Sequence, residues 1–169
     1  MSVELEIDSL NLLDVTIKTK NGQSVEYNVG EELKADIADL NEAFLTQPGK
    51  FAWWSTLAEN AKHQRDSLEA TLDKQEAEAD YKVRLSLELE GVKVTEAAVK
   101  QGIKKDEEYL DALKRYNAAK KTAGILSQVV KAFEQRKEML ISLGANLRKE
   151  NDNSDIVSLK EKARGTINR

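Results

Sequence analysis

The stretch that decides the fold runs from Asp106 to Glu150 and has the sequence DEEYLDALKRYNAAKKTAGILSQVVKAFEQRKEMLISLGANLRKE. Its apolar residues recur every three or four positions, the spacing that aligns side chains on one face of an α-helix. This apolar seam consists of Leu126, Val129, Phe133, Leu140, Leu143 and Leu147, with Arg136 at a seam position among them. About 45 residues would form a helix of roughly 65 Å. Because that length exceeds the width of a compact domain, the seam requires a partner from the same chain or from another copy.

A second long helix is predicted from about Phe51 to Glu90. Its seam consists of Trp54, Ala58, Ala61, Leu68, Leu72 and Ala79. The end of this helix is ambiguous, because apolar and polar residues alternate strictly between Tyr81 and Glu90, which is the period of a β-strand. Leu, Glu and Lys favour a helix. We therefore predict a helix that ends at Gly91, with a strand as the alternative.

The N-terminal region has the pattern of a small β-structure. Residues 3–8 alternate apolar and acidic side chains and predict a short strand, and Leu13–Val29 predicts a β-hairpin around Asn21-Gly22. An isolated hairpin is marginal in water, so it must pack on a helix, on the strand at 3–8 or on a neighbouring subunit. Glu31–Leu45 predicts an amphipathic helix, and a type II turn at Pro48-Gly49 is expected to end it.

The rest of the chain is predicted to be helical. Thr95 is expected to cap a short helix to about Lys104, Asp106 to cap the long one, and Gly102 to weaken the junction between them. A polar linker at 151–153 and a short final helix capped by Ser154 would follow. The sequence thus predicts a mainly α fold: residues 1–46 form a β-hairpin plus a short helix, residues 50–150 a long-helix bundle or coiled-coil core for oligomerisation and DNA binding, and residues 151–169 a flexible tail.

Composition and charge limit the possible functions. The chain carries a net charge of -4, but residues 1–46 hold ten acidic and three basic side chains, a balance of -7 that leaves +3 for the remainder. Cysteine is absent and His63 is the only histidine, so Cys-based sites are excluded and we expect no bound metal or cofactor. No phosphate-binding glycine loop or nucleophile elbow is present, and we expect no catalytic residue and no enzyme activity. No apolar run approaches a membrane span and no signal peptide is visible, which predicts a soluble cytoplasmic protein.

Basic residues crowd the segment 82–121, which has ten bases against seven acids. They form either a solvated helix face with ion pairs four residues apart, or a track for a nucleic-acid backbone. Trp53, Trp54, Tyr109 and Tyr116 could stack on bases in such a track. Because neighbouring residues on a helix point about 100° apart, Trp53 and Trp54 cannot both face one core.

Arg136 within the apolar seam allows two interpretations. Its stem could be buried while its charge reaches solvent, or it could pair with an acid across a subunit interface. We predict an oligomer interface that contains Trp54, Phe133, Arg136 and Leu140.

Several short motifs occur here in an order that resembles the UvsY-type recombination mediators of phages. They are Trp54-Ser55-Thr56-Leu57, Lys82-Val83-Arg84-Leu85, Lys93-Val94-Thr95-Glu96, Ala132-Phe133-Glu134-Gln135-Arg136-Lys137 and Met139-Leu140-Ile141-Ser142-Leu143-Gly144. The resemblance covers roughly 55–60% of the chain, from Trp54 to Leu147, and leaves residues 1–46 and the tail without an inherited role. It implies an all-helical, ring-like homo-oligomer that binds single-stranded DNA, helps to displace the single-strand-binding protein and nucleates the recombinase filament.

The resemblance implies a DNA-binding role for Lys82 and Arg84, and we expect Lys93, Lys104 and Lys105 to help them contact phosphates. If the protein is phage-encoded, it would act in the host cytoplasm. The alternative is a coiled-coil scaffold or assembly protein of a phage with no nucleic-acid role. The acidic region 1–46 either docks on a basic recombinase or single-strand-binding protein, mimics DNA, or caps the helical core.

Overall fold

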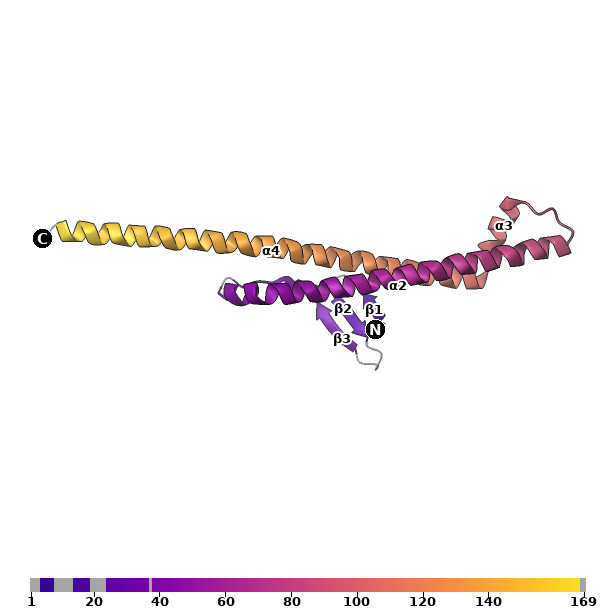
Figure 1. Cartoon of the computed structure of the whole chain (residues 1–169), viewed down its shortest axis with the longest axis horizontal. Coiled ribbons are helices and arrows are strands. Elements are labelled where there is room, and N and C mark those ends of the chain that lie inside the picture. The colour runs from indigo at the N-terminus through magenta and orange to yellow at the C-terminus, as the bar shows by residue number, and fades with distance from the viewer. Residues whose placement is uncertain (1–3, 8–13, 19–23, 37, 168–169) are drawn as a thin grey trace.

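A computed structural model describes the backbone of residues 4–7, 14–18, 24–36 and 38–167. Two long helices, α2 (Leu40–Leu89) and α4 (Glu107–Ile167), lie side by side and run in opposite directions (Figure 1). Trp54 of α2 stacks on Phe133 of α4, with ring centroids 6.1 Å apart. We call this antiparallel pair of helices the helical hairpin. The start of α2 lies opposite the middle of α4, so the C-terminal part of α4 projects beyond the helical hairpin. The predicted mainly α fold is confirmed.

The seams of the two helices meet in one core. From α4 it contains Leu126, Val129 and Phe133, and from α2 it contains Trp54, Leu57, Ala58 and Ala61. Leu140 is also buried, one turn further along α4 than Arg136. The central part of each predicted seam is therefore confirmed, and its partner is the other long helix of the same chain. Leu68, Leu143 and Leu147 are only half-buried, and Ala79 is buried against α3.

A three-stranded antiparallel sheet packs against the helical hairpin (Figure 1). It consists of β1 (Glu4–Ile7), β2 (Asp14–Lys18) and β3 (Ser24–Asn28), in the order β1-β2-β3. Val15 and Ile17 of the central strand are buried in the core beside Trp54. The predicted strand at 3–8 and the predicted β-hairpin are confirmed, whereas the predicted turn at Asn21-Gly22 lies outside the described residues.

The predicted helix from Glu31 to Leu45 is wrong. A short helix, α1 (Val29–Leu33), follows β3, and the side chain of Asn28 caps it by accepting a hydrogen bond from the Glu31 N–H. The chain then leaves the helical conformation, and α2 begins at Leu40.

The predicted turn at Pro48-Gly49 is also wrong, because α2 continues through Pro48. A proline inside a helix costs about 3 kcal/mol. Burial of Ala43 and Gln47 before it and Trp54 after it offsets that cost, while Pro48 itself lies on the exposed side. The helix therefore crosses the domain boundary that the sequence predicted between residues 46 and 50.

The far end of the hairpin carries α3 (Glu96–Ile103), which packs on α2. Residues 81–89 are helical, so the helix prediction is confirmed and the strand alternative is wrong; Gly91 follows with a positive φ of 67°. Thr95 caps α3, and Asp106 accepts a hydrogen bond from the Tyr109 N–H at the start of α4, as predicted. The predicted linker at 151–153 is wrong, because α4 runs unbroken to Ile167.

Gly102 has a packing role that the sequence did not indicate. A Cβ atom added to Gly102 would lie 2.5 Å from Cγ1 of Val83. The glycine therefore allows α3 to approach α2 closely.

Candidate functional site

The tip of the hairpin, where α2 ends and α4 begins, brings together the cations that the sequence singled out. Lys82 lies 2.5 Å from Glu108 of α4. Arg84 lies 2.7 Å from Asp80 on its own helix and 2.9 Å from Glu96 of α3. The hydrogen bond to Glu108 raises the pKa of Lys82, and the bonds to Asp80 and then Glu96 raise the pKa of Arg84. These two cations thus join α2 to α3 and α4, and acids compensate their charges.

The other predicted phosphate-binding lysines are differently placed. Lys93 precedes α3, and Lys104 and Lys105 follow it; Lys100 lies within α3. All four are exposed, and none forms an ion pair with a side chain that the structure describes. We call Lys93, Lys100, Lys104 and Lys105 the tip lysines. They are available to an anionic ligand without first breaking a salt bridge to the described part of the chain.

The alternating pattern at the end of α2 corresponds to a helix with two apolar faces. Residues two apart on a helix point about 200° apart, and residues four apart only about 40°. Val83 and Leu87 pack against the buried cluster formed by Ala79 of α2 and Val99 and Ile103 of α3. On the opposite face lie Tyr81, Leu85 and Leu89, which are 70%, 44% and 80% exposed. We call these three residues the outer stripe, and no described residue covers it.

The four residues predicted at an oligomer interface lie inside a single chain. Trp54, Phe133 and Leu140 are buried, and Arg136 is only 4% exposed. Their burial is explained by the packing of α4 on α2 and α1. The reason for placing a subunit interface at these residues therefore no longer holds.

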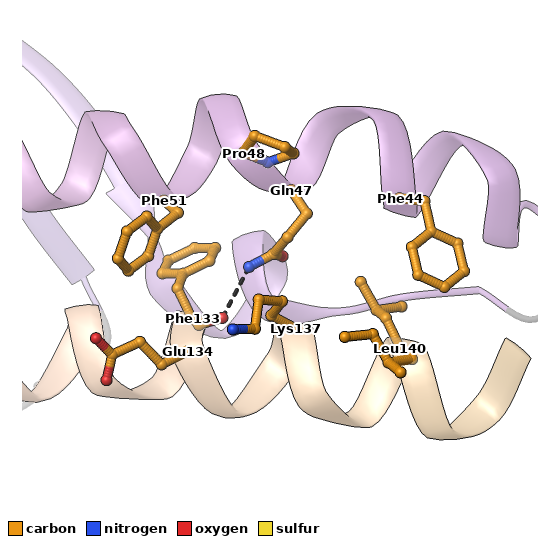
Figure 2. Close-up of a pocket in the computed structure, with 9 residues that line it drawn as sticks. Phe44, Gln47, Pro48, Phe51, Phe133, Glu134, Lys137 and Leu140 are labelled. Carbon is orange, nitrogen blue, oxygen red and sulfur yellow. Dashed lines mark hydrogen bonds between the residues drawn. The ribbon is translucent and has the colours of Figure 1, made fainter. Parts of the chain in front are cut away.

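The interpretation that the charge of Arg136 reaches solvent is wrong, because the residue is only 4% exposed. Pairing with an acid of another subunit stays a prediction, and no acid among the described residues of this chain forms an ion pair with Arg136. Its guanidinium donates to the carbonyl oxygens of Leu33 and Lys34, at 3.1 and 3.2 Å, and to Oε1 of Gln47. Gln47 in turn donates from Nε2 to the carbonyl oxygen of Phe133 at 2.7 Å (Figure 2). Burial lowers the pKa of Arg136. This network fastens the link between α1 and α2 onto α4.

A groove of about 470 Å³ lies beside this network, between the first turns of α2 and the middle of α4 (Figure 2). Its lining is mostly apolar and includes Phe44, Pro48, Phe51, Leu140 and Ile141. The charged residues at the groove are Glu134 and Lys137. A mostly apolar lining with a few polar groups is typical of pockets that bind small molecules, and an apolar surface also suits contact with another apolar surface.

Three of the four predicted base-stacking aromatics are engaged within the protein. Trp54 is in the core, Tyr109 packs against the α3 cluster, and the Tyr116 hydroxyl donates to Glu69 across the hairpin at 2.9 Å. That hydrogen bond raises the pKa of Tyr116. Trp53 is 47% exposed and lies beside Tyr27 of β3, near the start of α2, whereas the tip lysines lie near the other end of that helix. Tyr81, which the sequence interpretation did not select, is 70% exposed in the last part of α2, on the face opposite α3.

Among the described residues, no group of three or more His, Asp or Glu side chains could hold a metal ion, and His63 is exposed on α2. None of the helices in that part of the chain has an apolar stretch that could cross a bilayer.

Comparison with protein-family models, with curated proteins and with solved structures gave no match for this chain.

Proposed function

We propose that this protein is a non-enzymatic recombination mediator. It would act in the cytoplasm as a homo-oligomer that binds single-stranded DNA, loads a recombinase and helps to displace the single-strand-binding protein. The observation that supports this proposal best is the group of exposed tip lysines, which form no ion pair within the described residues. The order of motifs that resemble UvsY-type mediators supports it as well.

In this proposal the two groups of tip cations have different roles. The tip lysines contact phosphates, because no ion pair with a described side chain competes for their ammonium groups. Lys82 instead holds α2 to Glu108 of α4, and Arg84 holds α2 to Glu96 of α3, since each cation is already bonded to acids. A few phosphate contacts per chain give weak binding, and an oligomer strengthens it by presenting several tips to one strand.

The surfaces available for self-association are the exposed apolar ones. The outer stripe lies at the tip, and the groove near Phe44 and Ile141 lies towards the other end of α2. Leu45 of α2 and Met139 of α4 are further exposed apolar side chains. Burying either surface between copies removes apolar area from water, which favours association.

A titration of fluorescently labelled oligo-dT at two salt concentrations tests the DNA-binding role. The double variant Lys104→Ala with Lys105→Ala should weaken binding and reduce the salt slope by about 1.4, at ~0.7 for each phosphate that is no longer neutralised. A matched control is Lys131→Ala with Lys149→Ala, which removes two exposed lysines of α4 away from the tip and should leave the affinity unchanged. Equal weakening in both variants, or no binding by the wild-type protein at low salt, would reject DNA binding at the tip.

A structural scaffold or assembly protein of a phage is the second candidate. The exposed outer stripe favours this function, because an apolar helix face is better suited to bind a protein than to bind DNA. Indifference to oligo-dT together with co-elution with a capsid or tail protein would select this function over the first.

A further inference from the structure

Strand β3 is an edge of the sheet. It pairs with β2 on one side, and no residue that the structure describes pairs with its other side. On an edge strand, alternate residues direct their backbone N–H and C=O groups away from the sheet. Ser24, Val25, Glu26 and Asn28 are all exposed. The edge therefore offers unused backbone hydrogen bonds to an incoming strand.

An apolar surface lies next to this edge. Val25 and Tyr27 are paired with Ile17 and Val15 of β2, so they belong to the face of the sheet that turns towards the helices. The core buries Ile17 and Val15, but Val25 remains 45% exposed and Trp53 of α2 remains 47% exposed. The rings of Tyr27 and Trp53 lie 6.2 Å apart. A strand added to β3 would place every second side chain onto Val25 and Trp53.

The charge of the region indicates the kind of partner. Residues 1–46 have a balance of -7, and Glu26 is exposed on the outer face of β3. This field repels phosphates, so Trp53 is a poor base-stacking residue despite its exposure. The same negative field attracts basic side chains. In an added strand where basic and apolar residues alternate, the apolar residues face the helices, and the basic residues therefore lie on the outer face beside Glu26.

We propose that the exposed edge of β3 is a docking site for an extended segment of a partner protein in which apolar residues alternate with Lys or Arg. The segment adds a fourth strand beside β3, its apolar residues cover Val25 and Trp53, and its basic residues face Glu26. Peptide recognition by strand addition combines backbone hydrogen bonds for affinity with alternate side chains for specificity. The site is independent of the proposed DNA-binding tip, which lies roughly 50 Å further along α2.

Binding of a fluorescein-labelled peptide, Lys-Val-Lys-Val-Lys-Val, to the full chain tests the site. The peptide should bind the wild-type protein and protect the amides of residues 24–28 from hydrogen exchange. Glu26→Lys should weaken binding about tenfold, because it places a like charge against the peptide. Trp53→Ala should weaken it by removing the apolar surface. Glu76→Lys and Leu110→Ala are the matched controls, since Glu76 of α2 and Leu110 of α4 are both exposed away from the sheet, and both variants should bind as the wild type does.

Several results would overturn the proposal. One is no binding at about 1 mM peptide, which corresponds to an affinity weaker than about 4 kcal/mol. Others are equal binding of a Glu-Val-Glu-Val-Glu-Val peptide, equal binding by Glu26→Lys, and protection that falls outside β3. Competition by oligo-dT would assign Trp53 to DNA, and loss of a dimer in the Glu26→Lys variant without peptide would assign the edge to a second copy. Circular dichroism of each variant shows whether it is folded. If Trp53→Ala unfolds the protein, Glu26→Lys still tests the site, because Glu26 is exposed to solvent.

Discussion

Replacing Arg136 with methionine tests the role assigned to the buried network. The change keeps an unbranched side chain of similar length but removes the donors to Gln47, Leu33 and Lys34. The guanidinium keeps its proton near neutral pH even though burial lowers its pKa. Its burial therefore costs free energy, which the three hydrogen bonds must offset for the network to stabilise the fold.

The expected loss of stability follows from the acceptors that are left behind. Oε1 of Gln47 is bonded to Arg136 in a buried position, and leaving it unsatisfied costs about 1–3 kcal/mol. The carbonyls of Leu33 and Lys34 are part-buried, and we add about 1 kcal/mol for both because water can reach them in the variant. Relief of the desolvated charge returns about 1 kcal/mol or more. The free energy of unfolding should fall by about 1–3 kcal/mol, a drop of roughly 2–4 °C in Tm per kcal/mol.

Urea unfolding, followed by circular dichroism and by tryptophan fluorescence at one protein concentration, measures this change. Lys131→Met makes the same kind of substitution at an exposed position of α4 and should stay within about 0.5 kcal/mol of the wild type. Arg136→Met combined with Gln47→Leu removes donor and acceptor together and should cost less than the sum of the single changes by about 1–2 kcal/mol. An unchanged urea midpoint for Arg136→Met, or strict additivity in the double variant, would refute the assigned role.

Three further predictions concern the tip. Gly102→Ala should lower the free energy of unfolding by about 1–2 kcal/mol, because the new methyl group would overlap Val83. In urea unfolding, Gly102→Ala should cost less in a Val83→Ala background than in the wild type, which would show that this overlap is the cause. Arg84→Ala should speed hydrogen exchange in α3 while the amides of the α2–α4 core exchange as before; unchanged exchange in α3 would contradict the role of its ion pair with that helix. Leu85→Lys with Leu89→Lys should lower the mass of the oligomer measured by light scattering without loss of helical content, and an unchanged mass would remove the outer stripe as a contact surface.

The long-range architecture could be predicted from the sequence where one period repeats over many turns. The seam through Leu126, Phe133 and Leu140 fixes the face of α4 whatever covers it, and the structure buries all three. The end of α2 was harder to predict, because an alternating pattern describes both a strand and a helix with two apolar faces. Only the packing of α3 on one of those faces distinguishes them.

Local rules failed where contacts distant in the sequence decide the outcome. Pro48-Gly49 favours a turn in isolation, but burial of Gln47 and Trp54 against α4 keeps the helix continuous. The partners of Arg136 are 89 or more residues away in the chain, so no spacing in the sequence could reveal them. The same holds for Lys82, whose partner Glu108 is set by the register of the two helices.

The shape of the molecule separates its acidic region from the cations that we propose as contacts for DNA. The net charge of -7 belongs to residues 1–46, whose sheet lies beside Trp53, whereas the tip lysines lie in and around α3, which packs beside the last turns of α2 (Figure 1). From residue 53 to residue 83 a helix spans roughly 45 Å. Charges in solvent are largely screened beyond a Debye length of about 8 Å at physiological salt. The acidic sheet therefore does little to weaken the attraction of the tip lysines for phosphate, and net charge is a poor guide to what either end of this helical hairpin binds.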